Sequence, residues 1–174
     1  MNIKKQIILD CDPGQDDAVA LALAMAAKDE IDLLGVTTVA GNVPLNLTQR
    51  NARIMCDICH RTDIKVYAGA EKPMAQPLVT AEHVHGKSGL DGIVIYEPTT
   101  PLEEKHAVDF IIETCLAADN NSIFLVTTGP LTNIGLAIER APAILSKIKE
   151  IILMGGALRE GGNITPSAEF NIYV

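Results

Sequence analysis

Five short apolar runs, separated mostly by segments with helical character, constrain the fold of this 174-residue chain more than any other feature. The runs are residues 6–10, 31–39, 64–67, 122–127 and 151–154, and the segments between them predict helices at 16–28, 45–60, 106–118 and 132–140. Strands that are apolar on both faces are typical of a parallel sheet covered by helices on both sides. We therefore predict an α/β fold with an open, mainly parallel sheet, helices on both faces and right-handed crossovers.

Two stretches lack this pattern. Residues 69–96 are rich in glycine and proline and predict irregular structure, and Gly155-Gly156 open a glycine-rich loop that extends to Asn163. No composition shift or linker divides the chain. We expect residues 1–174 to form a single α/β domain.

The net charge and the apolar runs exclude several partners. A formal charge of −8 argues against nucleic acid and against an anionic membrane surface, because both require a basic face. The longest apolar run, residues 18–27, is shorter than the roughly 18 residues that a membrane span needs. No secretory leader is visible, so we expect a cytoplasmic protein whose four cysteines are free thiols.

Oxygen-bearing side chains follow the predicted strands. Ligands of such a sheet bind beyond the carboxyl ends of its strands. The residues in these positions are Asp10, Asp12, Asp16 and Asp17 after the first strand, Asn42 after the second, Thr127 and Thr128 after the fourth, and Asn163, Glu169 and Asn171 after the fifth. We expect them to converge on one edge of the sheet.

The acidic segment at residues 10–17 is the sharpest of these features. Four carboxylates packed at one sheet edge would raise one another's pKa values, and a helix N-terminus offsets only about 0.3–1 kcal/mol per acid. A bound divalent cation would offset far more, and hard oxygen ligands favour calcium or magnesium over zinc. The alternative is that Asp16 or Asp17 caps the following helix while the other acids are solvated.

Five motifs in a fixed order extend this pattern over the chain. They are DCDPGQDDA at 10–18, TTVAGN at 37–42, TTGPLTN at 127–133, MGGA at 154–157 and PSAEFN at 166–171. Together they resemble the inosine–uridine-preferring nucleoside hydrolase family. The resemblance implies an open α/β sheet, a tightly bound Ca²⁺, and hydrolysis of the N-glycosidic bond of ribonucleosides to ribose and free base, a salvage reaction.

The resemblance also implies roles for individual residues. Asp12 resembles the metal-bound carboxylate that takes a proton from the attacking water, Asp17 the bidentate calcium ligand, and Thr128 the residue whose main-chain carbonyl binds calcium. Asp10 is expected to orient the loop. The residues that resemble the substrate-binding set are Asp16, Asn42, Asn163, Glu169 and Asn171 for the ribose hydroxyls, and Met154 for the apolar contact under the sugar.

The segment HVHGKSGLDG at residues 83–92 is open to two interpretations. The resemblance suggests a lid over the substrate, with His85 near the 5′ end of the nucleoside or the leaving base, whereas composition alone indicates a mobile surface loop. The same segment resembles family members that favour pyrimidine nucleosides. We therefore expect uridine or cytidine to be better substrates than inosine.

Members of the resembled family continue beyond the equivalent of Val174 and supply a further Asp to calcium. On that basis we expect a domain truncated at its C-terminal end with little or no activity of its own, assembled as a homodimer or homotetramer. Two alternative functions stay open. One is a non-catalytic paralogue that binds ribose or calcium, and the other is a magnesium-dependent phosphohydrolase of the haloacid dehalogenase type, which also has an acid-x-acid motif after its first strand.

Overall fold

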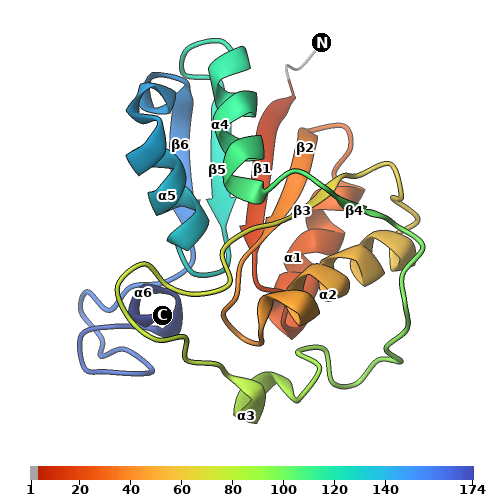
Figure 1. Cartoon of the computed structure of the whole chain (residues 1–174), viewed down its shortest axis with the longest axis vertical. Helices are drawn as coiled ribbons and strands as arrows, with labels where there is room; N and C mark the ends of the chain where they lie inside the picture. The colour runs from red at the N-terminus through yellow and green to blue at the C-terminus, as the bar shows by residue number, and fades with distance from the viewer. Residues whose placement is uncertain (1–3) are drawn as a thin grey trace.

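The computed structural model of the protein describes residues 4–174 and contains a six-stranded, entirely parallel sheet (Figure 1). The strands are β1 (Lys5–Cys11), β2 (Ile31–Thr38), β3 (Val66–Ala68), β4 (Leu102–Glu103), β5 (Ile123–Thr127) and β6 (Ile148–Leu153), in the spatial order β4-β3-β2-β1-β5-β6. The predicted open parallel sheet is confirmed.

Helices cover both faces of this sheet, as the doubly apolar strands predict. The helical elements are α1 (Gln15–Ala26), α2 (Leu45–Ile58), α3 (Glu82–His85), α4 (Ala107–Ala117), α5 (Thr132–Arg140), the 3-10 helix η1 (Pro142–Ser146) and α6 (Phe170–Tyr173). Successive side chains of a strand point to opposite faces. Ile8 of β1 accordingly packs in the core cluster of α4 and α5, whereas Leu9 packs in the cluster of α1 and α2.

The chain changes direction between β1 and β5. From β1 it builds outward through β2, β3 and β4, and it then crosses to the other side of β1 to add β5 and β6. The carboxyl ends of β1 and β5 therefore border the point where the strand order reverses, which is where open α/β sheets bind ligands. The acidic segment follows β1, and Thr128 follows β5.

The structure corrects several predicted boundaries. The region 69–96, expected to be irregular, contains the one-turn helix α3, and the two-residue strand β4 was not predicted. Strand β6 begins at Ile148 and not at residue 151, because Lys149 and Glu150 interrupt the apolar pattern at an exposed edge where pairing with β5 does not require burial.

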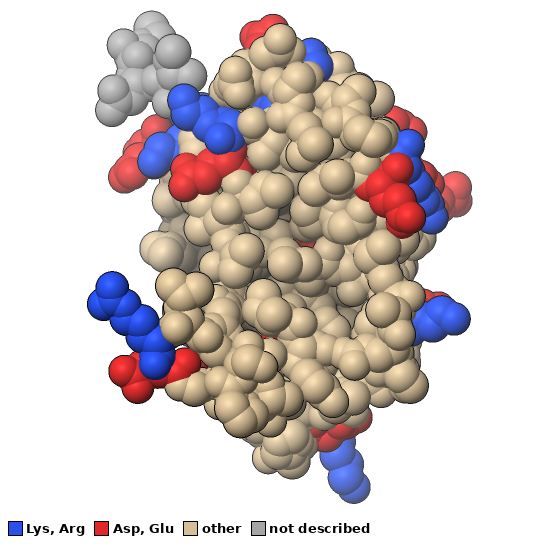
Figure 2. Space-filling view, turned by 90° about the vertical axis from the view of Figure 1, so that its left-hand side faces the viewer, with Lys and Arg blue, Asp and Glu red and all other residues tan. Residues whose placement is uncertain are grey.

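The edge strand β6 borders a largely uncharged surface. Figure 2 shows this side of the molecule, with charged side chains around the margin and few near the centre. At the end of β6 and just after it, Leu153 and Met154 are about half exposed, and Leu158 in the following loop is 99% exposed. No helix among residues 4–174 has the length and apolar character needed to cross a bilayer. The four cysteines are unpaired, as expected.

Candidate functional site

The loop after β1 holds two carboxylates inside the protein. Asp12 is fully buried, and its Oδ2 accepts a hydrogen bond of 2.7 Å from the backbone N–H of Asn42, while the Asn42 amide donates to the Asp12 carbonyl at 3.0 Å. Asp17 is also buried in the first turn of α1. Its Oδ2 accepts from the N–H of Gly14 at 3.0 Å, and its Oδ1 accepts from the Thr128 hydroxyl at 2.5 Å. The N-cap of α1 is Gly14, and Asp10 and Asp12 are buried, so the alternative in which Asp16 or Asp17 is the cap and the other acids are solvated is wrong.

Asp10, near the end of β1, is hydrogen-bonded to the segments that surround this loop. Its Oδ1 accepts hydrogen bonds from the Thr37 hydroxyl at 2.5 Å and from the Asn133 amide at 2.8 Å. Asn133 donates as well to the Thr38 carbonyl and accepts from the N–H of Ala70. These contacts connect Asp10 to three neighbouring segments at the sheet edge, in keeping with an orienting role.

Burial is unfavourable for all three charged carboxylates. Desolvation raises the pKa of Asp10 to about 7 and that of Asp17 to about 7, although hydrogen bonds from Thr37 and Thr128 oppose the shifts. For Asp12, desolvation and then the nearby Asp17 charge raise the pKa well above its ordinary value. A positive charge placed among these groups would relieve this penalty.

The donor set suits a hard cation in part. Asp12 Oδ1 is buried and has no hydrogen-bond partner among residues 4–174, so an enclosed oxygen is free to take a water molecule or a cation. No three His, Cys, Asp or Glu side chains in the described chain gather into a metal-binding cluster. The hard-oxygen groups gathered here are the Asp12 and Asp17 carboxylates and the backbone carbonyl and hydroxyl of Thr128, fewer oxygens than the six to eight that a calcium ion would need.

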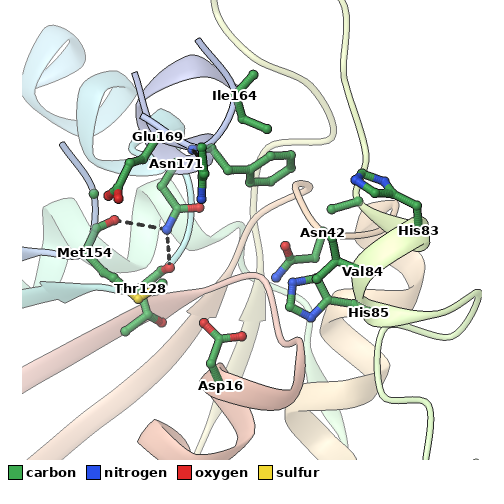
Figure 3. A pocket seen from close by; sticks show the side chains of 14 residues that line it. Asp16, Asn42, His83, Val84, His85, Thr128, Met154, Ile164, Glu169 and Asn171 are labelled. Carbon is green, nitrogen blue, oxygen red and sulfur yellow. Dashed lines mark hydrogen bonds between the residues drawn. The ribbon is translucent and has the colours of Figure 1, made fainter. Parts of the chain in front are cut away.

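A cavity of about 220 Å³ opens beside these acids. Eight of the ten residues predicted for the site line it, namely Asp16, Asn42, His85, Thr128, Met154, Asn163, Glu169 and Asn171. Figure 3 shows Met154, Glu169 and Asn171 on one side, Asn42 and His85 on the other, and Asp16 below. Asp12 and Asp17 lie behind this wall, in contact with Asn42 and Thr128. The tertiary structure therefore brings the whole predicted set together.

The segment before α6 organises one wall of the cavity. The Asn171 amide donates to the carbonyl of Thr128 at 2.6 Å and to that of Met154 at 3.0 Å, so its nitrogen is used within the protein and its oxygen remains for a ligand. Asn163 Oδ1 accepts from the N–H of Phe170 at the start of α6. No hydrogen bond among the described residues involves the carboxylate of Glu169, a residue that lines the cavity.

The opposite wall is a rim segment, residues 81–92, which contains α3. The Asn51 amide, which is buried, donates to the carbonyls of Pro13 and Ser88 at 3.1 and 2.8 Å. Gln15 donates to the carbonyls of His85 and Asp91, both at 3.3 Å. The rim segment is thus hydrogen-bonded to the acidic loop.

Sequence reasoning missed Gln15, Asn51 and His83, which also lines the cavity. Gln15 and Asn51 act through partners 37 to 76 positions away, and nothing in the local sequence indicates those partners. The position of Gln15 inside the acidic motif was the one available signal.

Comparisons with known proteins identify relatives of this chain. The chain is 54% identical over 169 residues to an uncharacterised protein of Schizosaccharomyces pombe, covering 97% of this chain and 54% of the yeast protein. It is 49% identical over 172 residues to the pyrimidine-specific ribonucleoside hydrolase RihB of Escherichia coli, covering 98% of this chain and 53% of RihB. The chain therefore spans about half the length of the curated relatives it matches.

Solved structures of nucleoside hydrolases are also similar to this chain. A plant nucleoside hydrolase, the PpNRh1 enzyme, superposes with a TM-score of 0.91 at 34% identity over 98% of this chain and 54% of that structure. The sequence profile described as inosine-uridine preferring nucleoside hydrolase matches residues 7–174. A profile match of this extent, on a fold whose sheet edge gathers the motif residues, shows that the chain belongs to the inosine-uridine preferring nucleoside hydrolase family.

Proposed function

We propose that this protein hydrolyses the N-glycosidic bond of ribonucleosides, with Asp12 as the group that accepts a proton from the attacking water. The observation that carries the proposal is the enclosed, unpartnered Oδ1 of Asp12 behind the cavity that Asp16, Asn42 and Glu169 help to line. The backbone N–H of Asn42 holds the other oxygen of the same carboxylate. One oxygen therefore fixes the side chain while the other stays free for water, as a general base requires.

The remaining wall residues suit a ribose. Asp16, Glu169 and the free oxygen of Asn171 offer acceptors for sugar hydroxyls, and Asn42 contributes an amide. Cleavage of a glycosidic bond passes through a positively charged, oxocarbenium-like sugar, which nearby carboxylates stabilise electrostatically. Met154 supplies an apolar contact at the edge of the same cavity.

Calcium is the cation that we assign to Asp12, Asp17 and the Thr128 carbonyl. The support is the hard-oxygen donor set and the raised pKa values of the buried carboxylates, which a cation would lower. When bound, the ion would act as a Lewis acid that makes a nearby water easier to deprotonate.

The test is release of free base from uridine, cytidine and inosine by the purified protein, first with calcium, then after chelation, then after calcium is restored. We expect Asp12→Asn to lower kcat by about 10²–10⁴-fold, because it removes the proton acceptor but keeps the shape of the side chain. Asp109→Asn, which removes a carboxylate from the exposed surface of α4, serves as the control. Less than about a tenfold loss, or ~1.4 kcal/mol, would assign Asp12 a structural role only.

The same assay ranks the bases. The pyrimidine specificity named for RihB at 49% identity supports the expected order of uridine or cytidine over inosine. The purine-preferring hydrolase of Gardnerella vaginalis, at 35% identity, supports the opposite order less strongly. Binding of ribose or calcium without turnover would favour the non-catalytic alternative.

A further inference from the structure

Gln15, the first residue of α1, joins the acidic loop to the imidazole of His85, which lies 70 positions later in the chain. Its side chain is exposed on the rim of the cavity and makes three hydrogen bonds to the rim segment. The three contacts together determine which nitrogen of His85 carries the hydrogen.

The orientation of the Gln15 amide follows from its carbonyl partners. One end of the amide lies 3.3 Å from the main-chain oxygens of both His85 and Asp91. A carbonyl oxygen can only accept a hydrogen bond, so this end must be the donating nitrogen Nε2. The other end, Oε1, is an acceptor, and it lies 2.6 Å from His85 Nδ1. Nδ1 must therefore be the donor in this pair.

We propose that Gln15 is a positioning residue that fixes neutral His85 as the Nδ1–H tautomer, leaving Nε2 as the only accepting atom of the ring. The hydrogen bond made by one ring nitrogen sets the state of the other. The consequence for catalysis rests on the proposed nucleoside hydrolysis, whereas the assignment of the tautomer does not.

The packing around the ring keeps it close to Gln15. A Cβ built on Gly14 would lie 2.5 Å from His85 Nδ1 and 3.0 Å from the Asn42 amide nitrogen, so only a glycine allows the ring this near approach. In Figure 3 the ring extends from α3 toward Asn42 and Asp16 on the cavity side. Gly14 and Gln15 thus hold one side of the ring while another side borders the cavity.

The fixed tautomer selects the chemistry of the ligand group that meets His85. Neutral His85 accepts a hydrogen bond at Nε2 from a substrate hydroxyl or N–H group, and it disfavours a bare carbonyl oxygen at the same place. If the ring takes up a second proton, Nε2 carries that proton and can donate it to a bound ligand. The Nδ1–H group meanwhile stays hydrogen-bonded to Gln15 Oε1.

The tautomer can be measured directly by ¹⁵N NMR of the protein labelled at its histidine rings. The chain has four histidines, and His85→Gln identifies the His85 signals by their loss. His106 is an internal contrast, because its Nδ1 accepts from the N–H of Val108 and its hydrogen must lie on Nε2. At pH about 8.5, above the ordinary histidine pKa of about 6.5, we expect Nδ1–H for His85 and Nε2–H for His106.

Two substitutions at position 15 distinguish the effect of the hydrogen bond to His85 from the effect of side-chain size. Gln15→Met has similar length but no acceptor, and we expect Nε2–H of His85 to become populated. Gln15→Glu keeps an acceptor for Nδ1, so the original tautomer should be retained. Gln49→Met, which removes the amide of a glutamine bonded to a carbonyl of its own helix, is the matched control. An Nε2–H signal for His85 in the unsubstituted protein, or an unchanged tautomer in Gln15→Met, would overturn the proposal.

Kinetics then connect the tautomer to turnover. For uridine we expect Gln15→Met to lower kcat/KM by about tenfold, which is ~1.4 kcal/mol, with recovery of most of that loss in Gln15→Glu. Absence of turnover in the unsubstituted protein would match the low activity expected of this chain by itself, count against hydrolysis by the chain as the proposed function, and leave the NMR assignment standing. Normal turnover together with the wrong tautomer would count against the role of Gln15 alone.

Discussion

Buried carboxylates dominate the behaviour of this protein at the scale of single residues. Asp10, Asp12 and Asp17 lie in the interior because they belong to the buried end of β1, the turn that follows it and the first turn of α1, respectively. The sequence predicts the cluster, since four acids follow one strand end. It does not predict which oxygen of each carboxylate is satisfied, because the donors come from Asn42, Thr128 and Asn133 on other segments.

These groups predict an unusual pH dependence for the metal-free protein. Burial raises the folded-state pKa of Asp10 and of Asp17 to about 7, above the ordinary value of 3.8 for an aspartate, so the folded form binds more protons than the unfolded form between these values. The free energy of unfolding should therefore fall as pH rises from about 4 to about 7. Urea unfolding across this range measures it, and Asp10→Asn should flatten the profile. A free energy that rises over the same interval would contradict the assigned shifts.

Elements rather than single residues define the rim of the cavity. The rim segment is hydrogen-bonded to the acidic loop through Asn51 and Gln15, and Ala81 donates to the Asn42 carbonyl at 2.8 Å. The one-turn helix α3 is too short to be stable alone, because helix nucleation is unfavourable for so few residues. The sequence pattern accordingly indicates an irregular stretch, and the tertiary contacts with α1 and α2 order it.

Asn51→Ala tests this connection. Removing the amide leaves the buried carbonyl of Pro13 and the carbonyl of Ser88 without their donor, which should cost about 1–3 kcal/mol and expose the rim segment to faster limited proteolysis. Asn46→Ala on the same helix is the control, because its side chain is exposed. Equal cleavage rates at the rim segment in the two variants would show that Asn51 does not hold it.

At the scale of the whole molecule, the uncharged surface beside β6 is the most prominent feature (Figure 2). An edge strand presents unpaired backbone groups, and Leu158 is almost fully exposed next to it. Exposed apolar side chains such as Leu153, Met154 and Leu158 can mark sites of association when they gather on one surface. This is consistent with the expected homo-oligomer.

We therefore expect the protein to self-associate in a concentration-dependent manner that Leu158→Lys weakens. Sedimentation velocity over a hundredfold range of concentration measures the effect. Leu145→Lys provides a control, since Leu145 is 52% exposed and belongs to η1 instead of the loop after β6. Similar sedimentation of the two variants and the unsubstituted protein would argue that the surface beside β6 is not the interface.

The sequence by itself determined the parallel α/β sheet, the order of most elements and the edge at which the site forms. It could do so because apolar periodicity and strand-end residues are local properties, and parallel strands bring their carboxyl ends to one edge. Only the tertiary structure decided that Gln15 meets His85, that Asn171 gives its amide to Thr128 and Met154, and that Leu102–Glu103 pairs as a strand. Those outcomes depend on contacts between segments distant in the chain, and local propensity carries no information about such contacts.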